Sequence, residues 1–136
     1  MPERVVVHVD GGARGNPGPA AIAAVVATPE GEVIEGLGET IGKATNNVAE
    51  YRALLLGIER ARQAGAAEVE LVGDSELVVK QVKGEYRVKD AGLRELHGEV
   101  RAALSGFERW SIRHERREQN ADADRLVNEA LDQAAG

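Results

Sequence analysis

The sequence predicts a single α/β domain, and three observations carry that prediction. The chain has 136 residues, which suits one domain with a modest core. Three extended segments, the first of them rich in β-branched residues, follow one another on short turns, which indicates an antiparallel meander. Helical and extended segments then alternate towards the C-terminus, so the expected order is βββαβααβα, a layered α/β arrangement.

The three N-terminal strands are separated by two turn signals. Residues 4–10 form a short β-branched run, which is the pattern of a strand. The sequence Asn-Pro-Gly at 16–18 places proline and glycine at the central positions of a type II turn, so a hairpin into a strand over residues 20–28 is predicted. The sequence Pro-Glu-Gly at 29–31 turns the chain again, into a third strand over residues 32–39.

Helical periodicity begins after this meander. Leu54, Ile58 and Ala61 share one face of a helix predicted over residues 47–63, and Gly65 ends it. The remaining expected elements are a strand over 68–72, a helix over 75–82 ended by Gly84, a helix over 91–104, a strand over 109–114 and a helix over 120–134. Because a helical crossover usually makes its flanking strands parallel, the fourth strand is expected to lie parallel to an earlier one.

Composition excludes several classes of protein. The chain contains no cysteine, so it has neither a disulfide framework nor a thiolate metal site, and a cytoplasmic location is expected. The longest apolar run, residues 20–27, is far shorter than the ~20 residues of a membrane-spanning helix, and no signal peptide is evident. The net charge of −6, from 17 basic and 23 acidic residues, argues against a generic nucleic-acid binder.

Two groups of basic residues stand out against this acidic balance. The first lies within residues 80–94 and the second within residues 113–117. Taken alone, either group is most simply interpreted as solvated helix and loop charge. The first comprises Lys80, Lys83, Arg87, Lys89 and Arg94, interspersed with the two acids Glu85 and Asp90, and the second comprises Arg113, Arg116 and Arg117.

Two aspartates occupy positions where strands end. Asp10 ends the first strand, and Asp74 follows the fourth strand immediately before a helix. Open α/β sheets bind their ligands beyond the carboxyl ends of strands, which is where both side chains would lie. Asp10 could instead start a turn, and Asp74 could cap the following helix, since aspartate is common in both roles.

Two further acids lie on helix faces that must be buried. Glu50 shares the face that packs on the sheet, where a charge is costly unless it is paired or binds a metal. Its alternative role is a capping-box glutamate three residues after Asn47. Asp124 precedes Val127 on the apolar stripe of the last helix, whereas Asp122 falls on the polar side. The alternative for Asp124 is a carboxylate favoured by the helix dipole.

Together these four acids predict a metal site. If they converge on one edge of the sheet, their mutual repulsion requires divalent cations. Oxygen ligands without cysteine select hard ions, Mg²⁺ or Mn²⁺. Carboxylates that share two such ions suit in-line displacement at phosphorus, in which one ion activates water and the other stabilises the leaving oxygen.

Four segments of the chain resemble ribonuclease H of type 1. They read VDGGARGNPGPA, TNNVAEYRAL, LVGDSELVVKQVKG and HERREQNADADRLVNEAL, and the match runs from about residue 5 to residue 131. The resemblance implies one catalytic domain over residues 1–136, with a five-stranded mixed sheet, three antiparallel strands followed by two parallel ones, and helices on both faces. It also implies a monomer without an obligate protein partner, which cleaves the RNA strand of an RNA–DNA hybrid and leaves 5′-phosphate and 3′-hydroxyl ends.

The resemblance assigns the catalytic residues. Asp10, Glu50, Asp74 and Asp124 match the family's metal-binding quartet, in which Asp10 would bridge two ions, Mg²⁺ or, as a substitute, Mn²⁺. His114 matches a histidine proposed to help proton transfer or product release, a role that suits the imidazole group. From the residues alone, His114 would be an exposed histidine at the end of a strand.

The resemblance also assigns the substrate contacts. Asparagine donates and accepts hydrogen bonds, so it suits groove atoms, and an RNA 2′-hydroxyl marks the strand to be cut. Glycines let that strand approach the backbone, and a cation with a hydroxyl suits a phosphate of the DNA strand. The residues are Asn16, Asn46 and Asn47 for the minor groove, Gly11 and Gly12 for the RNA strand, and Lys43 and Thr45 for the phosphate. Asn46 and Asn47 could equally cap the helix, and the two roles are compatible.

The chain lacks one feature of the best-known bacterial members of this family. Their lysine- and tryptophan-rich basic protrusion is replaced by KGEYRVKDAGLREL, which runs directly into the next helix. The chain is therefore similar to the compact subgroup. Fewer phosphate contacts are expected to weaken substrate binding and salt tolerance, and the bases of residues 80–94 are a partial substitute. Compact members sometimes cut other RNA-containing duplexes, which leaves a broader specificity open.

Two other functions compete with this one. A catalytically inactive domain of the same fold would bind hybrids without cutting them, but it would be expected to lose one or more of the acids. A small nucleotide-binding protein would use GGARGNPG to cradle phosphates. That loop lacks the known phosphate-binding spacings, and it leads into a strand instead of a helix.

Overall fold

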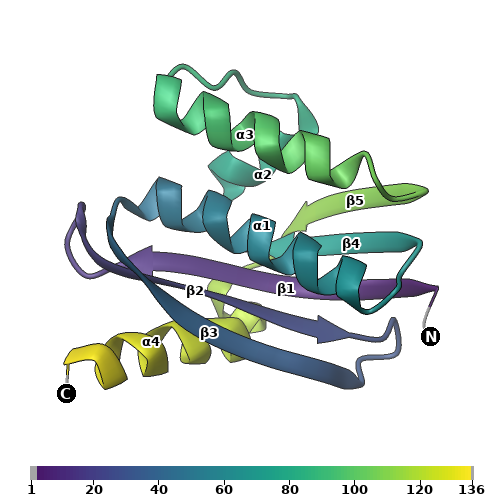
Figure 1. The fold of residues 1–136 in the computed structure, drawn as a ribbon, viewed down its shortest axis with the longest axis horizontal. Helices are drawn as coiled ribbons and strands as arrows, with labels where there is room; N and C mark the ends of the chain where they lie inside the picture. The colour runs from purple at the N-terminus through teal and green to yellow at the C-terminus, as the bar shows by residue number, and fades with distance from the viewer. Residues whose placement is uncertain (1–2, 136) are drawn as a thin grey trace.

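Five strands and four helices follow one another in the predicted order in the computed structural model, which describes residues 3–135 (Figure 1). The strands are β1 (Arg4–Ala13), β2 (Gly18–Ala27), β3 (Val33–Ala44), β4 (Glu68–Gly73) and β5 (Arg109–His114). The helices are α1 (Asn46–Gln63), α2 (Glu76–Lys83), α3 (Ala91–Leu104) and α4 (Ala121–Ala135), with a 3₁₀ turn at Arg117–Asn120. No helix within this range is long and apolar enough to cross a membrane.

The strands form one mixed sheet in the order β3-β2-β1-β4-β5. β2 is antiparallel to both β1 and β3, whereas β4 is parallel to β1 and β5 is parallel to β4. The predicted arrangement of three antiparallel strands followed by two parallel ones is therefore confirmed. The register pairs His8 with Val72, so Asp10 and Asp74, each two residues further along, lie at the same edge of the sheet.

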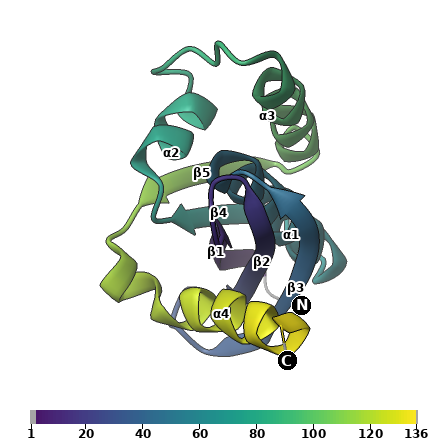
Figure 2. The same ribbon diagram turned by 90° about the vertical axis from the view of Figure 1, so that its left-hand side faces the viewer.

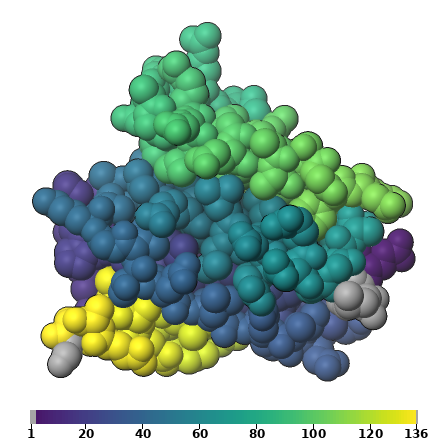
Figure 3. Space-filling view, viewed as in Figure 1, coloured from purple at the N-terminus to yellow at the C-terminus, as the bar shows by residue number. Residues whose placement is uncertain are grey.

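Helices cover both faces of the sheet, as the side view shows (Figure 2). The larger core lies between the sheet and α1 and α3, and it includes Val5, Val7, Val9, Leu54, Ile58, Leu71 and Leu104. The smaller core lies between β2 and α4, and it includes Ala21, Ala23, Val25, Ala123, Val127 and Leu131. In the space-filling view, α3 and the segment that precedes it project beyond the rest of the molecule (Figure 3).

Small residues at four-residue spacing let α1 lie close to the sheet. The buried stripe consists of Ala49, Ala53, Gly57 and Ala61. A Cβ added to Gly11 of β1 would lie only 2.3 Å from the carbonyl oxygen of Ala49. Glycine is therefore required where the two backbones touch. This contact brings Glu50, the next residue of α1, to the edge of the sheet that carries Asp10.

The hairpin between β1 and β2 differs from its prediction. The type II turn over residues 16–18 is wrong, because Gly18 already belongs to β2 and the positive φ of this loop, 98°, lies at Gly15. Pro19 has no N–H, so it cannot donate the hydrogen bond that would close a turn starting at Asn16. Instead, the Arg14 N–H donates to the carbonyl oxygen of Pro19 at 2.8 Å.

Two strands are longer than predicted. β1 continues to Ala13 instead of ending at residue 10, and β3 continues to Ala44 instead of ending at residue 39. Gly11 and Gly12 in the first extension have a low strand propensity, but pairing with β2 holds them in the strand. Gly42 in the second extension has a φ of 80° and lies at an irregularity in the pairing with β2. Asp10 consequently lies inside β1, although its neighbour β4 has already ended.

Candidate active site

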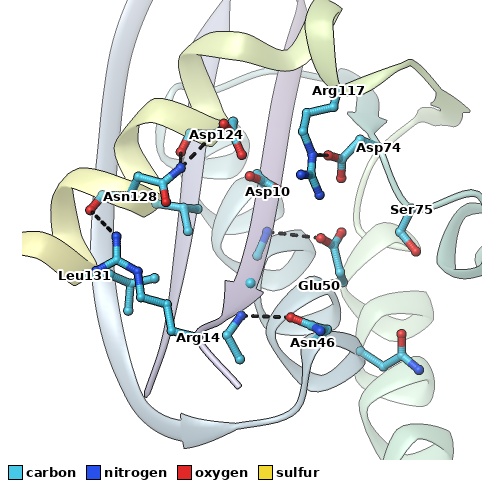
Figure 4. A pocket seen from close by; sticks show the side chains of 15 residues that line it. Asp10, Arg14, Asn46, Glu50, Asp74, Ser75, Arg117, Asp124, Asn128 and Leu131 are labelled. Carbon is cyan, nitrogen blue, oxygen red and sulfur yellow. Dashed lines mark hydrogen bonds and ion pairs between the residues drawn. The ribbon is translucent and has the colours of Figure 1, made fainter. Parts of the chain in front are cut away.

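Four acidic side chains from four different elements face one cleft (Figure 4). The cleft has a volume of about 530 Å³ and is lined by residues of β1, α1, α4 and the segment that follows β4. Asp10 lies in β1, Glu50 in α1 and Asp124 in α4, and Asp74 is the residue that follows β4. The predicted convergence of the four acids is therefore present in the structure.

The alternative roles of the two aspartates near the strand ends are excluded. Asp10 pairs with Ala23 within the ladder between β1 and β2, so it does not start a turn. Ser75 caps α2 in place of Asp74, since its hydroxyl oxygen accepts a hydrogen bond from the Val78 N–H at 3.3 Å. Both carboxylates are therefore available to the cleft, and the parallel register of β1 and β4 places them there.

Glu50 is a buried carboxylate near the N-terminus of α1, with 9% of its surface exposed. Its Oε1 accepts a hydrogen bond from the Gly11 backbone N–H at 3.3 Å. The capping-box alternative is wrong, because Thr45 caps α1 through the Val48 N–H and Glu50 lies beyond the first turn. The small-residue stripe of α1 thus delivers Glu50 to β1 at short range.

Asp124 reaches the cleft from the opposite face of the sheet. It is half-buried in the first turn of α4, and its carboxylate faces that of Asp10. The Asn128 side-chain amide, one turn later, donates to the carbonyl oxygen of Asp124 at 3.1 Å and lies 3.5 Å from its Oδ2. Asp122 is exposed, as the helical pattern predicted.

Burial and mutual repulsion raise the pKa values of two of these acids. The pKa of Asp10 is raised to about 8, first because burial disfavours the charged carboxylate and then because Asp74 and Asp124 repel it. The pKa of Glu50 is raised well above its usual range by burial and by repulsion from Asp10 and Asp74, while the Gly11 N–H opposes the shift. Without cations, the cluster therefore retains protons at neutral pH.

The cluster fits a divalent cation. One oxygen each from Asp10, Glu50 and Asp74 lie within 4.8 Å of one another. All the donors are carboxylate oxygens, which suit hard ions. A bound cation would also remove the repulsion that raises the pKa values of the acids. Asp124 stands outside this trio but lines the same cleft.

Arg117 is a cleft residue that the sequence analysis missed. Its Nε lies 3.6 Å from Oδ2 of Asp74, although 76% of the arginine side chain is exposed. The 3₁₀ turn at Arg117–Asn120 presents this side chain to the acids. From the sequence alone Arg117 is interpreted as solvated charge, because nothing near it in the chain indicates a partner that follows the distant strand β4.

Asn120 is a second residue that the sequence analysis missed, and it connects α4 to β1. It is 2% exposed, and its Nδ2 donates to the carbonyl oxygen of Val9 at 2.7 Å. Its Oδ1 pairs with Nδ1 of His8 at 3.1 Å. Since Val9 precedes Asp10, this buried amide fixes the start of α4, and with it Asp124, relative to Asp10. In the sequence, Asn120 has the form of an ordinary residue at a helix start.

Two of the predicted groove-reading asparagines hold the backbone around the cleft. Oδ1 of Asn46 accepts a hydrogen bond from the Ala13 N–H at 2.9 Å. Oδ1 of Asn16 accepts from the Asn46 N–H at 3.0 Å. The pair fastens the β1–β2 loop to the start of α1. Asn46 and Asn47 both line the cleft, and neither is the N-cap of α1.

The predicted glycine, lysine and threonine contacts occupy different settings. Gly11 is required by its contact with α1, so its lack of a side chain has a packing reason. At Gly12 the nearest atom to an added Cβ would be 4.0 Å away, which leaves this backbone open to the cleft. Lys43 lies outside the acidic cleft, in a separate hollow between β3 and the end of α4. The Thr45 hydroxyl accepts the capping hydrogen bond of α1.

His114 lies beside the cleft and not in its lining. It is exposed, ends β5 and pairs with Gly73, the residue before Asp74. The pKa of Glu76 is lowered mainly by Lys80 and to a smaller extent by His114, which places the imidazole near the start of α2.

The fold and the site define a class of α/β domains in which a mixed sheet gathers carboxylates for hard cations. Known proteins of this class are similar to the chain. A family model described as reverse transcriptase-like matches residues 8–130. The chain is 47% identical over 131 residues to ribonuclease HI of Halobacterium salinarum, and the match covers 96% of this chain and 66% of that protein.

Solved structures agree with these matches. The crystal structure of RNase H1 from Halobacterium salinarum superimposes with a TM-score of 0.94 over 96% of this chain and 98% of that one. LC11-RNase H1 in complex with an RNA/DNA hybrid superimposes with a TM-score of 0.92 at 40% identity, over 97% of this chain and 99% of that one. The chain belongs to the ribonuclease H family of type 1. It spans only part of its longer relatives, for example 36% of a 45% identical bifunctional protein of Mycobacterium tuberculosis.

Proposed function

We propose that this chain is a metal-dependent endoribonuclease that cleaves the RNA strand of RNA–DNA hybrids. The convergence of four carboxylates on one cleft carries the proposal. The reaction would be hydrolysis of a phosphodiester bond that leaves a 5′-phosphate and a 3′-hydroxyl. We assign it to residues 1–136 as one catalytic domain that acts as a monomer in the cytoplasm.

The four carboxylates would hold two divalent cations, with Asp10 between them. Asp10 suits the central position because it faces both Asp74 and Asp124. Mg²⁺ is the favoured ion for an all-oxygen site, and Mn²⁺ is a possible substitute. When bound, such ions supply an activated water and neutralise charge on the leaving oxygen. The chain's own contribution is to fix the ligands, through the Gly11 N–H on Glu50 and the Asn128 amide beside Asp124.

Residues beside the acids would position the two strands of the substrate. Gly12 leaves open backbone next to the carboxylates, so the RNA strand can approach there. Asn46 and Asn47 line the same cleft and can meet groove atoms and the 2′-hydroxyl. Lys43, in its separate hollow beside Thr45, would meet a phosphate of the DNA strand.

His114 would assist the reaction from outside the cleft. An exposed imidazole next to Asp74 can exchange protons both with bulk water and with groups in the site. We therefore assign it to proton transfer or product release, as a helper to the four acids.

The segment between α2 and α3, residues 84–90, here called the basic loop for its cations Arg87 and Lys89, would extend the substrate surface. It also carries two exposed acids, Glu85 and Asp90, so its effect would come from where the two cations stand and not from a net positive charge. Asn47 lines both the acidic cleft and a neighbouring hollow that it forms with Tyr86, Arg87 and Lys89. A phosphate backbone that leaves the cleft over Asn47 therefore comes within reach of Arg87 and Lys89, although Glu85 and Asp90 line the same hollow. The basic loop also lies in the projecting part of the molecule (Figures 1 and 3).

The test is cleavage of an end-labelled RNA–DNA hybrid with Mg²⁺, with Mn²⁺ and with a chelator. We expect metal-dependent cleavage by the wild type and a loss of roughly 100-fold or more in Asp10→Asn and in Asp124→Asn. Asp122→Asn is the matched control, because Asp122 is exposed two residues before Asp124, and it should keep the wild-type rate.

Two results would refute the proposal: no metal-dependent cleavage by the wild type, or unchanged cleavage in both variants. Binding of the hybrid without cleavage would instead support a catalytically inactive binding module. Parallel reactions with duplex RNA and single-stranded RNA measure how strictly the enzyme requires a hybrid.

A further inference from the structure

The basic loop directs its charged side chains outward. Arg87 and Lys89 are exposed, and Tyr86 is 48% exposed. Nζ of Lys80 lies 5.1 Å from the centre of the Tyr86 ring, so a cation and an aromatic face share this surface. Such a surface suits a nucleic-acid backbone, which offers phosphates to the cations and sugars or bases to the ring.

Side chains of α2 and α3 hydrogen-bond to the backbone of the basic loop. Three successive carbonyl oxygens, those of Arg87, Val88 and Lys89, accept hydrogen bonds from side chains. Nε2 of Gln81 donates to the first at 3.3 Å, and Arg94 donates to the other two at 3.3 and 3.2 Å. A loop without strand or helix pairing is ordinarily among the least stable parts of a domain. These three bonds, together with those from the Glu85 and Tyr86 N–H groups to the carbonyl oxygen of Lys80, therefore hold the loop cations in place.

Gln81 also connects the basic loop to the helix that carries Glu50. Its side chain is 6% exposed, and its Oε1 accepts a hydrogen bond of 2.6 Å from the hydroxyl of Tyr51, which is fully buried. Burial raises the pKa of Tyr51 to about 12, so the phenol remains a neutral donor. Tyr51 directly follows Glu50, and a buried polar pair of this kind is costly to separate. A continuous set of contacts thus runs from the acidic cleft through Tyr51 and Gln81 to the loop carbonyl of Arg87.

We infer that Gln81 is a positioning residue that holds the basic loop at a fixed place relative to the acidic cleft, so that Arg87 and Lys89 meet the backbone of the bound nucleic acid. The inference rests on the proposed function and adds a determinant of affinity to it. A loop that is already ordered before binding loses little conformational entropy when the substrate binds. The ordering by Gln81 should therefore increase the affinity for the substrate. Gln81 itself is 6% exposed and also lines the hollow beside Asn47, and the inference assigns its effect to the loop that it holds.

The experiment compares Gln81→Met with Arg101→Met. Methionine fills the space of Gln81 without polar atoms. Arg101 also donates to a backbone carbonyl at the end of α2, that of Val82, but it makes no bond to the basic loop and serves as the matched control. A second variant, Tyr51→Phe/Gln81→Met, removes both polar groups of the buried pair, so no orphan hydroxyl remains if the single variant folds poorly.

The expected result is an effect on binding and not on turnover. Gln81→Met and the double variant should raise KM for the hybrid roughly 3- to 10-fold at unchanged kcat, the loss expected from re-ordering one or two side chains on binding. The slope of log affinity against log salt should become shallower by about 1. In an Arg87→Gln/Lys89→Gln background, the additional effect of Gln81→Met on KM should disappear, because the cations that it positions are gone. Arg101→Met should keep the wild-type KM.

Separate outcomes decide the inference and the proposed function. A wild-type KM and salt slope in folded Gln81→Met, or an undiminished effect in the Arg87→Gln/Lys89→Gln background, would overturn the inference. Hybrid binding is also measured by fluorescence anisotropy in an Asp10→Asn background, which does not require cleavage. Weaker binding there in Gln81→Met supports the inference even if the wild type does not cleave, whereas the absence of any hybrid binding overturns it.

Discussion

Replacing Asp10 with asparagine is expected to stabilise the metal-free protein at neutral pH, although the change removes a proposed metal ligand. The Asp10 side chain is 6% exposed and faces the carboxylates of Asp74 and Asp124. Asparagine has nearly the same shape but carries no charge. The substitution should therefore remove repulsion with little loss of packing.

The size of the effect follows from the pKa of Asp10, which the folded structure raises from 3.8 to about 8. At pH 7 the unfolded chain has released this proton and the folded chain keeps it. The interval of about 3 pH units between 3.8 and 7, at 1.36 kcal/mol per unit, gives an upper bound on the order of 4 kcal/mol. Water reaches the cleft and screens the charges, so we expect a measured gain in unfolding free energy of about 1–3 kcal/mol.

The sign of the pH dependence follows from the same shift. Because the folded state binds the Asp10 proton more tightly than the unfolded state does, the metal-free wild type should lose stability as the pH rises from about 4 to about 8. The stability of Asp10→Asn should decline less with pH, and it should approach that of the wild type at about pH 4. Mg²⁺ binds the ionised cluster, so it should stabilise the wild type at the alkaline end far more than it stabilises the variant.

Urea unfolding in the presence of a chelator, repeated across this pH range, measures each of these effects. Asp122→Asn is the control, since it removes one exposed carboxylate from the same helix that carries Asp124. The reasoning fails if the stability of the metal-free wild type is constant over the range. It also fails if Asp10→Asn lowers the free energy of unfolding at neutral pH.

Three further predictions concern residues around the acids. Gly11→Ala should destabilise the fold by about 2 kcal/mol or more, because its Cβ would meet an α1 carbonyl oxygen at 2.3 Å. Gly12→Ala should keep the wild-type melting temperature and raise KM. Equal melting temperatures for the two variants would contradict this prediction. Asn120→Ala should lower the free energy of unfolding in urea by about 1–3 kcal/mol, because it removes the hydrogen bond to the buried carbonyl oxygen of Val9. It should also lower kcat, because the start of α4 is held less firmly. An unchanged kcat would show that the position of α4 does not depend on this bond. Arg117→Met should tighten Mg²⁺ binding about 2-fold in calorimetric titration, since a cation beside Asp74 competes with the metal; weaker binding would mean that Arg117 organises the site instead.

The acids could be predicted from the sequence because local patterns determine where each one points. Asp10 and Asp74 follow apolar runs that could only be strands, and strand ends on one sheet edge lie close together. Glu50 and Asp124 interrupt helical stripes that must face the sheet. Periodicity and connection rules are properties of short segments, so they are visible without the fold.

The surroundings of the acids could not be predicted, because contacts between distant segments create them. Arg117 meets Asp74, and Asn120 meets Val9, only after β5 and α4 have folded against the sheet. The turn over residues 16–18 failed for a related reason. Its local residues favoured a type II geometry, but pairing with Ala44 of β3 draws Gly18 into β2.

The backbone around the acids explains why protons or cations, and not a movement of the chain, must relieve their repulsion. Three of the four acids are carried by segments that other groups hold: Glu50 by the Gly11 N–H, the end of β1 by Asn46, and the start of α4 by Asn120. These bonds oppose any shift that would expose or separate the carboxylates, so burial and repulsion together keep the pKa values of Asp10 and Glu50 raised. A rigid site of this kind is less stable when empty and binds a cation without first having to close. These hydrogen bonds keep the carboxylates close together, which makes the metal-free fold less stable at alkaline pH. The same arrangement would hold the metal ligands in place before the ions bind.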